Sequence, residues 1–196
     1  ERGDALAALG EVTGHVALTQ MYDRMMTDRT GQRILLDKPV VTSRRHDIDE
    51  LWETTSEGSF GRAYASFMKS HGFDPDERTG VRFIEDEELA YVMLRYRQCH
   101  DFWHVLCDLP PTVPGELALK WLELIQTGLP VAALSVTAGQ LRLTADERRV
   151  LRERYLPWAV NVGKKATFLM NVYYEEEFDT DLEVLRERLG IERAPQ

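Results

Sequence analysis

The sequence predicts an all-α fold, built as a single-domain helical bundle of about seven to nine helices. Apolar residues recur at the spacing of one helix face along most of the chain. Alternation of apolar and polar residues sustained over several strands is absent, and so is an internal repeat. The chain has 196 residues, of which 43% are hydrophobic, so it is long enough to bury one core and gives no reason to divide it. We therefore expect residues 1–196 to form one domain.

The first half of the chain contains three amphipathic segments, and Pro39 and Gly72 follow the second and the third. Helices are expected over residues 4–26, 28–36 and 59–70. Gly10 and Gly14 interrupt the first of these helices, which also carries His15. We expect His15 to be a packed, hydrogen-bonded histidine and not a site residue. The polar segments 40–50 and 72–83 are expected to be irregular.

A longer helix is expected over residues 86–107. Its apolar side is formed by Leu89, Val92, Met93, Tyr96, Trp103 and Leu106. The acidic residues 85–88 lie at its start, where negative charge complements the positive end of the helix dipole, so we interpret them as capping residues and not as metal ligands. His100 lies on the apolar side, between Tyr96 and Trp103. We therefore expect this histidine to point into the bundle.

The second half of the chain begins with an expected helix over residues 116–127, which a Gly-Leu-Pro sequence ends. The apolar segment 129–141 carries no charge. We expect it to be a buried helix, in preference to a wall that accepts an apolar ligand or the bilayer surface. Capping boxes open the last two helices, and they pair Thr144 with Glu147 and Thr180 with Glu183. Pro157 kinks or ends the first of these helices, and Gly190 ends the second.

Composition restricts the partners and the compartment. The formal net charge of −9 argues against a nucleic-acid partner, because phosphate binding needs clustered Lys and Arg. Cys99 and Cys107 lie eight positions apart on one expected helix, too far to bridge, which suits a reducing compartment or the mitochondrial matrix. No apolar run approaches the roughly 20 residues of a membrane span. The chain starts abruptly without a targeting segment, so we expect the mature part of a longer product.

Four metal-capable side chains gather near the end of the central helix, and they are His100, Asp101, His104 and Glu116. His100 and His104 are four positions apart and project from one helix face, with Asp101 at its edge. Eleven residues, three of them proline, separate His104 from Glu116. This length allows a turn that returns Glu116 on the first turn of the next helix. Two imidazoles with nearby carboxylates suit Zn²⁺, and also Fe²⁺ or Mn²⁺.

Two other metalloenzyme classes are alternatives at this motif. A metalloprotease of the H-E-x-x-H type is a weak alternative, because Asp101 stands where those enzymes use glutamate as the base. A helical metal phosphohydrolase built around a His-Asp doublet is a more serious rival. It needs a further upstream histidine and a downstream aspartate, for which His71 and Asp146 are available.

The sequence HDFWH, followed by eleven residues and Glu116, resembles the HDxxH-x11-E signature of the fourth-numbered coenzyme Q biosynthesis protein family, a mitochondrial family of ubiquinone synthesis. Further segments resemble that family over nearly the whole chain. They are GEVTGH at 10–15, EGSFGR at 57–62, DEELAYVMLRYRQCHD at 86–101, PGELALKWLELIQTGLP at 114–130, LPWAV at 156–160, NVYYE at 171–175 and LRERLGI at 185–191. The main departure is at the front, where the family's transit segment has no counterpart.

The resemblance implies that His100, Asp101, His104 and Glu116 are the metal ligands and catalytic residues, with zinc as the usual metal. It implies a protein on the matrix side of the mitochondrial inner membrane, peripheral to it, in a complex with other ubiquinone biosynthesis proteins. It further implies a homodimer and an isoprenoid held in an apolar groove, as in relatives that the chain resembles.

The implied activity is removal of the C1 carboxylate from a polyprenylated 4-hydroxybenzoate intermediate, either alone or coupled to hydroxylation at C1. The segment 129–141 and the helix 116–127 are then candidates for a groove that shields the prenyl tail. The alternative is a non-catalytic, lipid-binding scaffold that organises the complex and uses the metal only to hold two helices together.

Overall fold

The computed structural model describes residues 2–77 and 80–195, with the side chains of residues 2–7 left aside. Helices, and no strand, make up the regular structure of this described part, which confirms the all-α class. Its α-helices are α1 (Arg2–Thr13), α2 (His15–Met26), α3 (Arg29–Asp37), α4 (Ile48–Thr54), α5 (Phe60–His71), α6 (Glu87–Cys107), α7 (Val113–Thr127), α8 (Pro130–Gly139), α9 (Ala145–Val150), α10 (Leu156–Lys165) and α11 (Leu182–Leu189). Short 3₁₀ turns add η1 (Pro75–Glu77), η2 (Gln140–Arg142), η4 (Leu169–Asn171) and η5 (Tyr174–Glu176).

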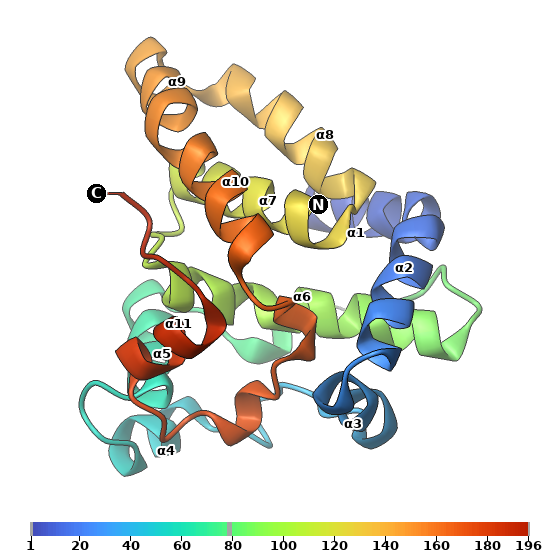
Figure 1. The fold of residues 1–196 in the computed structure, drawn as a ribbon, viewed down its shortest axis with the longest axis vertical. Helices are drawn as coiled ribbons and strands as arrows, with labels where there is room; N and C mark the ends of the chain where they lie inside the picture. Colours follow the sequence, from blue (N-terminus) through green and yellow to red (C-terminus); the bar gives the residue numbers. More distant parts are fainter. Residues whose placement is uncertain (1, 78–79, 196) are drawn as a thin grey trace.

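Helix α6 is the central element of the fold (Figure 1). It packs against α2, α3, α5 and α7, and it is buried along most of its length. Trp103 and Phe102 are among its fully buried side chains, and each such side chain contributes about 1.5–3 kcal/mol of hydrophobic stabilisation. Because neighbours cover α6 on several sides, polar groups on it have to find partners inside the protein.

Both ends of α6 are capped by side chains. Asp86 accepts hydrogen bonds from the backbone amides of Glu88 and Leu89 at 2.9 and 3.0 Å, which confirms capping at the acidic cluster. At the other end, the buried guanidinium of Arg186 donates to the carbonyl oxygens of Val105 and Leu106, both at 2.8 Å. A cation at a helix C-terminus complements the helix dipole, so α11, which carries Arg186, fixes the end of α6.

The other helix boundaries largely follow the expected ones. The first expected helix is divided at Gly14 into α1 and α2, and Gly10 lies within α1. The prediction that segment 40–50 is irregular throughout was wrong at its end, because Asp47 caps the short helix α4. This helix carries no buried residue, so no apolar stripe indicated it. His15 is exposed, so the prediction of a packed histidine was also wrong.

Two capping predictions had different outcomes. The box of Thr144 and Glu147 is present at the start of α9. The box of Thr180 and Glu183 was wrong, because Asp181 caps α11 by accepting from the amides of Glu183 and Val184. An aspartate one position later reaches the same free amides without help from a second side chain.

Pro157 does not end the helical path that begins at α9. A π-helical turn, η3 (Leu151–Tyr155), joins α9 to α10, and Pro157 lies in the first turn of α10. Proline has no amide hydrogen to donate, so a widened turn just before it fits the missing hydrogen bond. The chain therefore continues from α9 to α10 with a local irregularity.

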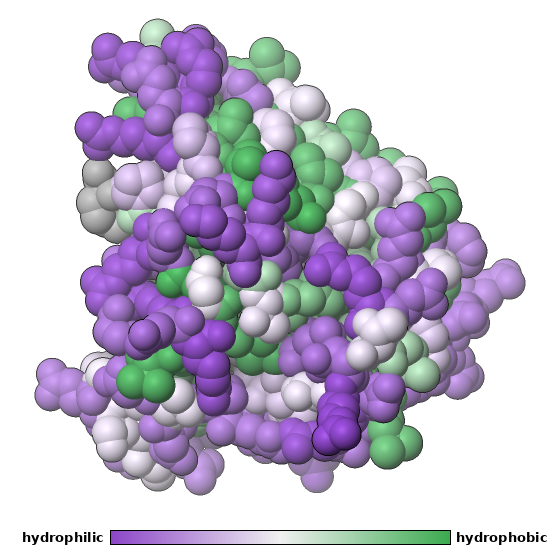
Figure 2. Space-filling view, in the orientation of Figure 1, coloured by the Kyte–Doolittle hydropathy of each residue, from purple (hydrophilic) through white to green (hydrophobic). Residues whose placement is uncertain are grey.

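Helix α8 lies at the surface, so the prediction of a buried helix over residues 129–141 was wrong. Only Ala132 and Val136 of α8 are buried, whereas the side chain of Leu134 is 45% exposed and that of Leu141, just beyond the helix, is 85% exposed. Figure 1 shows α8 at the upper right of the molecule, and Figure 2, in the same orientation, shows hydrophobic residues among polar ones there. Among the described residues, no helix combines the length and hydropathy that a bilayer crossing requires.

Candidate metal centre

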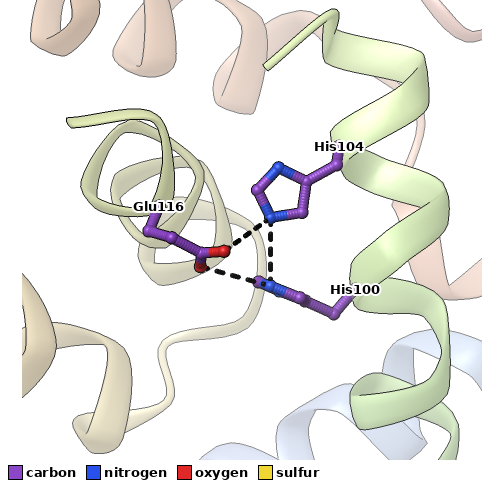
Figure 3. Close-up of side chains that lie close together, drawn as sticks. All are labelled: His100, His104 and Glu116. Carbon is purple, nitrogen blue, oxygen red and sulfur yellow. Dashed lines mark hydrogen bonds and ion pairs between the residues drawn. The ribbon is translucent and has the colours of Figure 1, made fainter. Parts of the chain in front are cut away.

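The candidate metal centre lies between α6 and the first turn of α7. His100 and His104 are one helical turn apart on α6, and both point toward Glu116 of α7 (Figure 3). Thr112 caps α7 with its hydroxyl, accepting from the amide of Gly115 at 3.4 Å. The prediction that Glu116 returns on the first turn of the next helix is confirmed, although that helix begins at Val113.

The turn that ends α6 also orients His104. Asp108 adopts a left-handed conformation, and the amide of Leu109 donates to the carbonyl oxygen of His104 at 3.0 Å. The carbonyl oxygen of Leu109 lies 3.0 Å from Nδ1 of the same histidine. A carbonyl oxygen only accepts, so Nδ1 of His104 carries a proton and Nε2 of the neutral ring has a free lone pair. The helix terminus therefore fixes both the position and the tautomer of His104.

Three potential ligand atoms converge at the centre. Nε2 of His104 lies 3.1 Å from Glu116 Oε1 and 3.2 Å from Nε2 of His100, and the latter atom lies 3.4 Å from Glu116 Oε2. One ligand atom from each residue lies within 4.8 Å of the other two. The two histidines are buried, whereas the side chain of Glu116 is 39% exposed. The centre is thus closed on the histidine side and accessible beside Glu116.

The donor set and its spacing fit a divalent metal. Zinc binds imidazole nitrogen at about 2.0–2.1 Å, and tetrahedral geometry then places neighbouring ligand atoms about 3.3 Å apart. The separations of 3.1–3.4 Å among the three residues agree with this value. A lone pair on Nε2 of His104 that faces another imidazole nitrogen and a carboxylate is stabilised by a cation between them, which is either a proton or a metal ion. His100, His104 and Glu116 therefore form a suitable metal site.

Asp101 is the fourth residue of the expected ligand set, and the structure does not group it with the other three. It is buried, and it follows His100 directly on α6, which turns its side chain about 100° around the helix. Its coordination of the metal stays a prediction. The structure therefore brings together three of the four expected residues.

The residues needed by a phosphohydrolase lie elsewhere. Among the described residues, the metal-capable group contains neither His71 nor Asp146. His71 is exposed, with Nδ1 2.8 Å from the carbonyl oxygen of Phe67. Asp146 forms a surface ion pair with Arg149 at 3.1 Å. We therefore discard the phosphohydrolase alternative.

Three residues beside the centre were missed at the level of sequence, and they are Tyr96, Lys120 and Glu123. Glu123 is 1% exposed, and its Oε1 lies 2.6 Å from Nδ1 of His100. Its Oε2 accepts from Lys120 Nζ at 2.6 Å and from the hydroxyl of Tyr96. For Lys120 and Glu123 the available signal was their spacing from Glu116, since these three residues recur on one face of an otherwise apolar helix.

Charge pairing sets the ionisation of the carboxylates. Burial alone raises the pKa of Glu123, but Lys120 and His100 outweigh it and lower the pKa to about 2. Burial also opposes ionisation of Glu116, yet without a metal the Nε2 atoms of His100 and His104 can carry protons and donate them to this carboxylate, which holds its pKa well below the ordinary range. Both carboxylates are therefore charged at neutral pH.

An aromatic side chain closes the histidine side of the centre. The ring of Phe67, on α5, stacks on His104 with centroids 5.4 Å apart and an interplanar angle of 20°. Phe67 also contacts the rings of His71 and Phe73, which lie toward the surface. The metal centre thus has an apolar, aromatic wall on the α5 side.

Comparisons with known proteins give a consistent result. The family model of "Coenzyme Q (ubiquinone) biosynthesis protein Coq4" matches residues 1–195. The mitochondrial ubiquinone biosynthesis protein COQ4 homolog of Nematostella vectensis is 46% identical over 196 residues, covering 98% of this chain and 94% of that protein. The Homo sapiens homolog of the same name is 42% identical over 194 residues, covering 99% of this chain and 73% of that protein.

A solved structure shares the fold. It is a Nostoc punctiforme protein described provisionally as a ubiquinone biosynthesis protein, with a TM-score of 0.71 and 20% sequence identity. The match covers 89% of this chain and 81% of that one. At this identity the likeness supports the helical architecture and not a particular activity.

Proposed function

Because this chain belongs to the Coq4 family of ubiquinone biosynthesis proteins, we propose that it is a metal-dependent lyase that removes the C1 carboxylate from a polyprenylated 4-hydroxybenzoate intermediate. The observation that carries the proposal is the convergence of His100, His104 and Glu116 on one point that is buried on the histidine side and open beside Glu116. A site that keeps one side open suits catalysis, whereas structural zinc sites are closed by four protein ligands.

The reaction replaces one bond at the ring. The bond between C1 and the carboxylate carbon breaks, CO₂ leaves, and the electron pair that remains on C1 takes a proton. When bound at the centre, Zn²⁺ would supply Lewis-acid stabilisation of negative charge, and because it has no redox chemistry of its own it favours simple decarboxylation over coupled hydroxylation.

The residues of this chain hold the metal and exclude water on one side. His100 and His104 supply neutral nitrogen ligands and Glu116 a carboxylate. Asp101, buried on the same turn of α6, is the candidate that transfers a proton to C1 if it stays uncoordinated. The stacked ring of Phe67 provides an apolar wall beside the histidines.

The prenyl tail needs an apolar surface next to the centre. Helix α8 packs against α7, the helix that carries Glu116, and it exposes Leu134. This surface supports a tail groove along α7 and α8. The names of the relatives support a mitochondrial setting. We also propose that the protein lies at the matrix face of the inner membrane, as a homodimer associated with other ubiquinone biosynthesis proteins.

The alternative function is a non-catalytic scaffold, and one observation favours it. The three candidate ligands join the end of α6 to the start of α7, so a metal there would hold these two helices together even without chemistry. Lipid binding along α8 serves a scaffold as well as an enzyme.

The experiment that separates the two functions compares His100→Ala and Glu116→Gln with wild type. Metal content, CO₂ release from carboxyl-labelled substrate, thermal unfolding and binding of partner proteins are measured together. The enzyme proposal expects both variants to lose metal and turnover while Glu116→Gln stays folded and binds its partners. His100→Ala protein with full metal content and full turnover would refute it, whereas activity that falls only in proportion to folding or partner binding supports the scaffold.

A further inference from the structure

Behind His100 lies a buried charged group that the proposed reaction does not use. Glu123 is surrounded by three donors, which are Lys120, Tyr96 and the Nδ1 side of His100. A buried carboxylate is costly unless hydrogen bonds compensate for its lost hydration. Each oxygen of Glu123 has such a partner, so its side chain is held in a single orientation.

The distances assign the proton between Glu123 and His100. Nδ1 of His100 lies 2.6 Å from the carboxylate oxygen of Glu123 and 3.5 Å from the ammonium of Lys120. A charge-assisted N–H···O⁻ hydrogen bond has a length of about 2.7–2.9 Å, so the contact with Glu123 is a strong bond and that with Lys120 is marginal. A carboxylate only accepts, so Nδ1 of His100 carries the proton and donates it.

We propose that Glu123 is a positioning residue of the metal centre, which fixes His100 with Nδ1 protonated and with the Nε2 lone pair directed toward His104 and Glu116. Metal-binding histidines are commonly oriented in this way by an acceptor on the other ring nitrogen. Here Leu109 provides a carbonyl for His104 and Glu123 provides a carboxylate for His100. The inference rests on the metal centre of the proposed function and is independent of whether decarboxylation follows.

Lys120 and Tyr96 support the orientation of Glu123 without reaching the ligand face of the centre. Both donate to Oε2, whereas Oε1 faces Nδ1 of His100. Lys120 also compensates the charge of Glu123, so the pair adds no net charge beside the metal.

The test measures zinc affinity and the position of the histidine proton in Glu123→Gln. Competition with a chelator gives the affinity, and spectra of ¹⁵N-histidine-labelled, metal-free protein report the Nδ1 proton of His100. We expect affinity to fall about 10- to 100-fold, as happens when such orienting partners are removed. Lys120 and Tyr96 both donate at the position of Oε2, so the amide oxygen of the glutamine should take that position and its NH₂ group, which only donates, should face Nδ1 of His100. We therefore also expect the Nδ1–H signal of His100 to be lost.

The matched control is Glu175→Gln. Glu175 also neutralises a buried cation of α6, Arg95, but does not contact His100. This variant should lose stability while it keeps the zinc affinity and the Nδ1 proton of wild type. If Glu123→Gln does not fold, Lys120→Met with Glu123→Gln takes its place, because the double variant leaves no unpaired ammonium.

The inference is overturned if the Glu123 variant binds zinc as tightly as wild type and keeps the Nδ1 proton. It is also overturned if Glu175→Gln weakens zinc binding equally, because a general loss of packing would then explain both results. Absence of CO₂ release by wild-type protein contradicts the proposed reaction alone, since both readouts here are taken without substrate.

Discussion

At the scale of single residues, each histidine of the candidate metal centre has one ring nitrogen bonded to the protein and the other facing Glu116. His104 uses the carbonyl of Leu109 and His100 uses the carboxylate of Glu123. The two thiols nearby are excluded from the centre. Cys99 and Cys107 are free, fully buried cysteines, and burial raises the pKa of each thiol to about 12.

We predict that both thiols resist disulfide reagents in the folded protein. At pH 8, a pKa near 12 instead of the ordinary 9.0 lowers the thiolate fraction about a thousandfold, and burial blocks access as well. Ellman's reagent should therefore detect both thiols promptly only after unfolding in guanidinium chloride. The single variants Cys99→Ala and Cys107→Ala identify which thiol reacts, and prompt reaction of either one in the native protein contradicts the buried placement.

At the scale of elements, the turn between α6 and α7 determines where Glu116 lies relative to the histidines. Gly115, directly before Glu116, is buried against this turn, and an added Cβ would overlap the carbonyl oxygen of Pro110. That atom belongs to the backbone, so the overlap is not relieved by rotating a side chain. The close contact of Gly115 with Pro110 therefore fixes the start of α7.

We predict that Gly115→Ala lowers the free energy of unfolding by about 1–3 kcal/mol and weakens zinc binding, because α7 must shift and take Glu116 with it. Chemical denaturation and chelator competition measure the two effects. Gly80→Ala is the control, since a Cβ at Gly80 meets nothing within 4 Å. Equal stability and zinc affinity in the two variants would show that the turn does not position Glu116.

At the scale of the whole molecule, the N-terminal helix is joined to the core through a buried carboxylate. Glu11 of α1 accepts from the amides of Arg82 and Phe83 at 2.8 and 2.6 Å and pairs with Arg97 of α6 at 2.7 Å. Burial alone raises the pKa of Glu11, but these three donors hold it below the ordinary 4.5. The ionised form is therefore the one that the folded protein stabilises.

The sign of the pH dependence follows from this lowered pKa. The contribution of Glu11 is complete above pH 4.5 and is lost as the pH falls through its lower value in the folded protein. We predict that Glu11→Gln costs about 1–3 kcal/mol at pH 7, and that its difference from wild type shrinks as the pH falls below 4.5. Urea denaturation at several pH values measures this, and a difference that stays constant would contradict it.

The sequence predicts the parts of the site that follow from spacing along the chain. The spacing of His100 and His104 places both on one face of α6, and the proline-containing turn returns Glu116 to them. The role of Glu123 was not predicted in this way. Glu116, Lys120 and Glu123 share one helix face, and a charged face has the pattern of a solvated surface until the packing of α7 on α6 buries it. The grouping of Asp101 depends on side-chain rotation, which spacing does not fix.

For the whole fold, too, some features were predictable from the sequence and others were not. Helices with a clear apolar stripe, such as α5 and α6, begin and end close to their expected residues. The small, apolar residues of α8 predict a buried helix, yet α8 lies at the surface with Leu134 exposed. Hydrophobicity predicts that a surface will be covered, but not whether the cover is the same chain, a lipid or another protein.

We propose that His100, His104 and Glu116 hold a metal that the reaction needs. The most direct measurement strips the protein of metal with a chelator, restores Zn²⁺ in steps, and follows CO₂ release from a carboxyl-labelled polyprenyl 4-hydroxybenzoate at each occupancy. We predict no release from the metal-free protein and a rate that rises in proportion to bound zinc up to one ion per chain. Full turnover by metal-free protein, or no turnover at any occupancy with zinc, iron or manganese, would contradict this proposal.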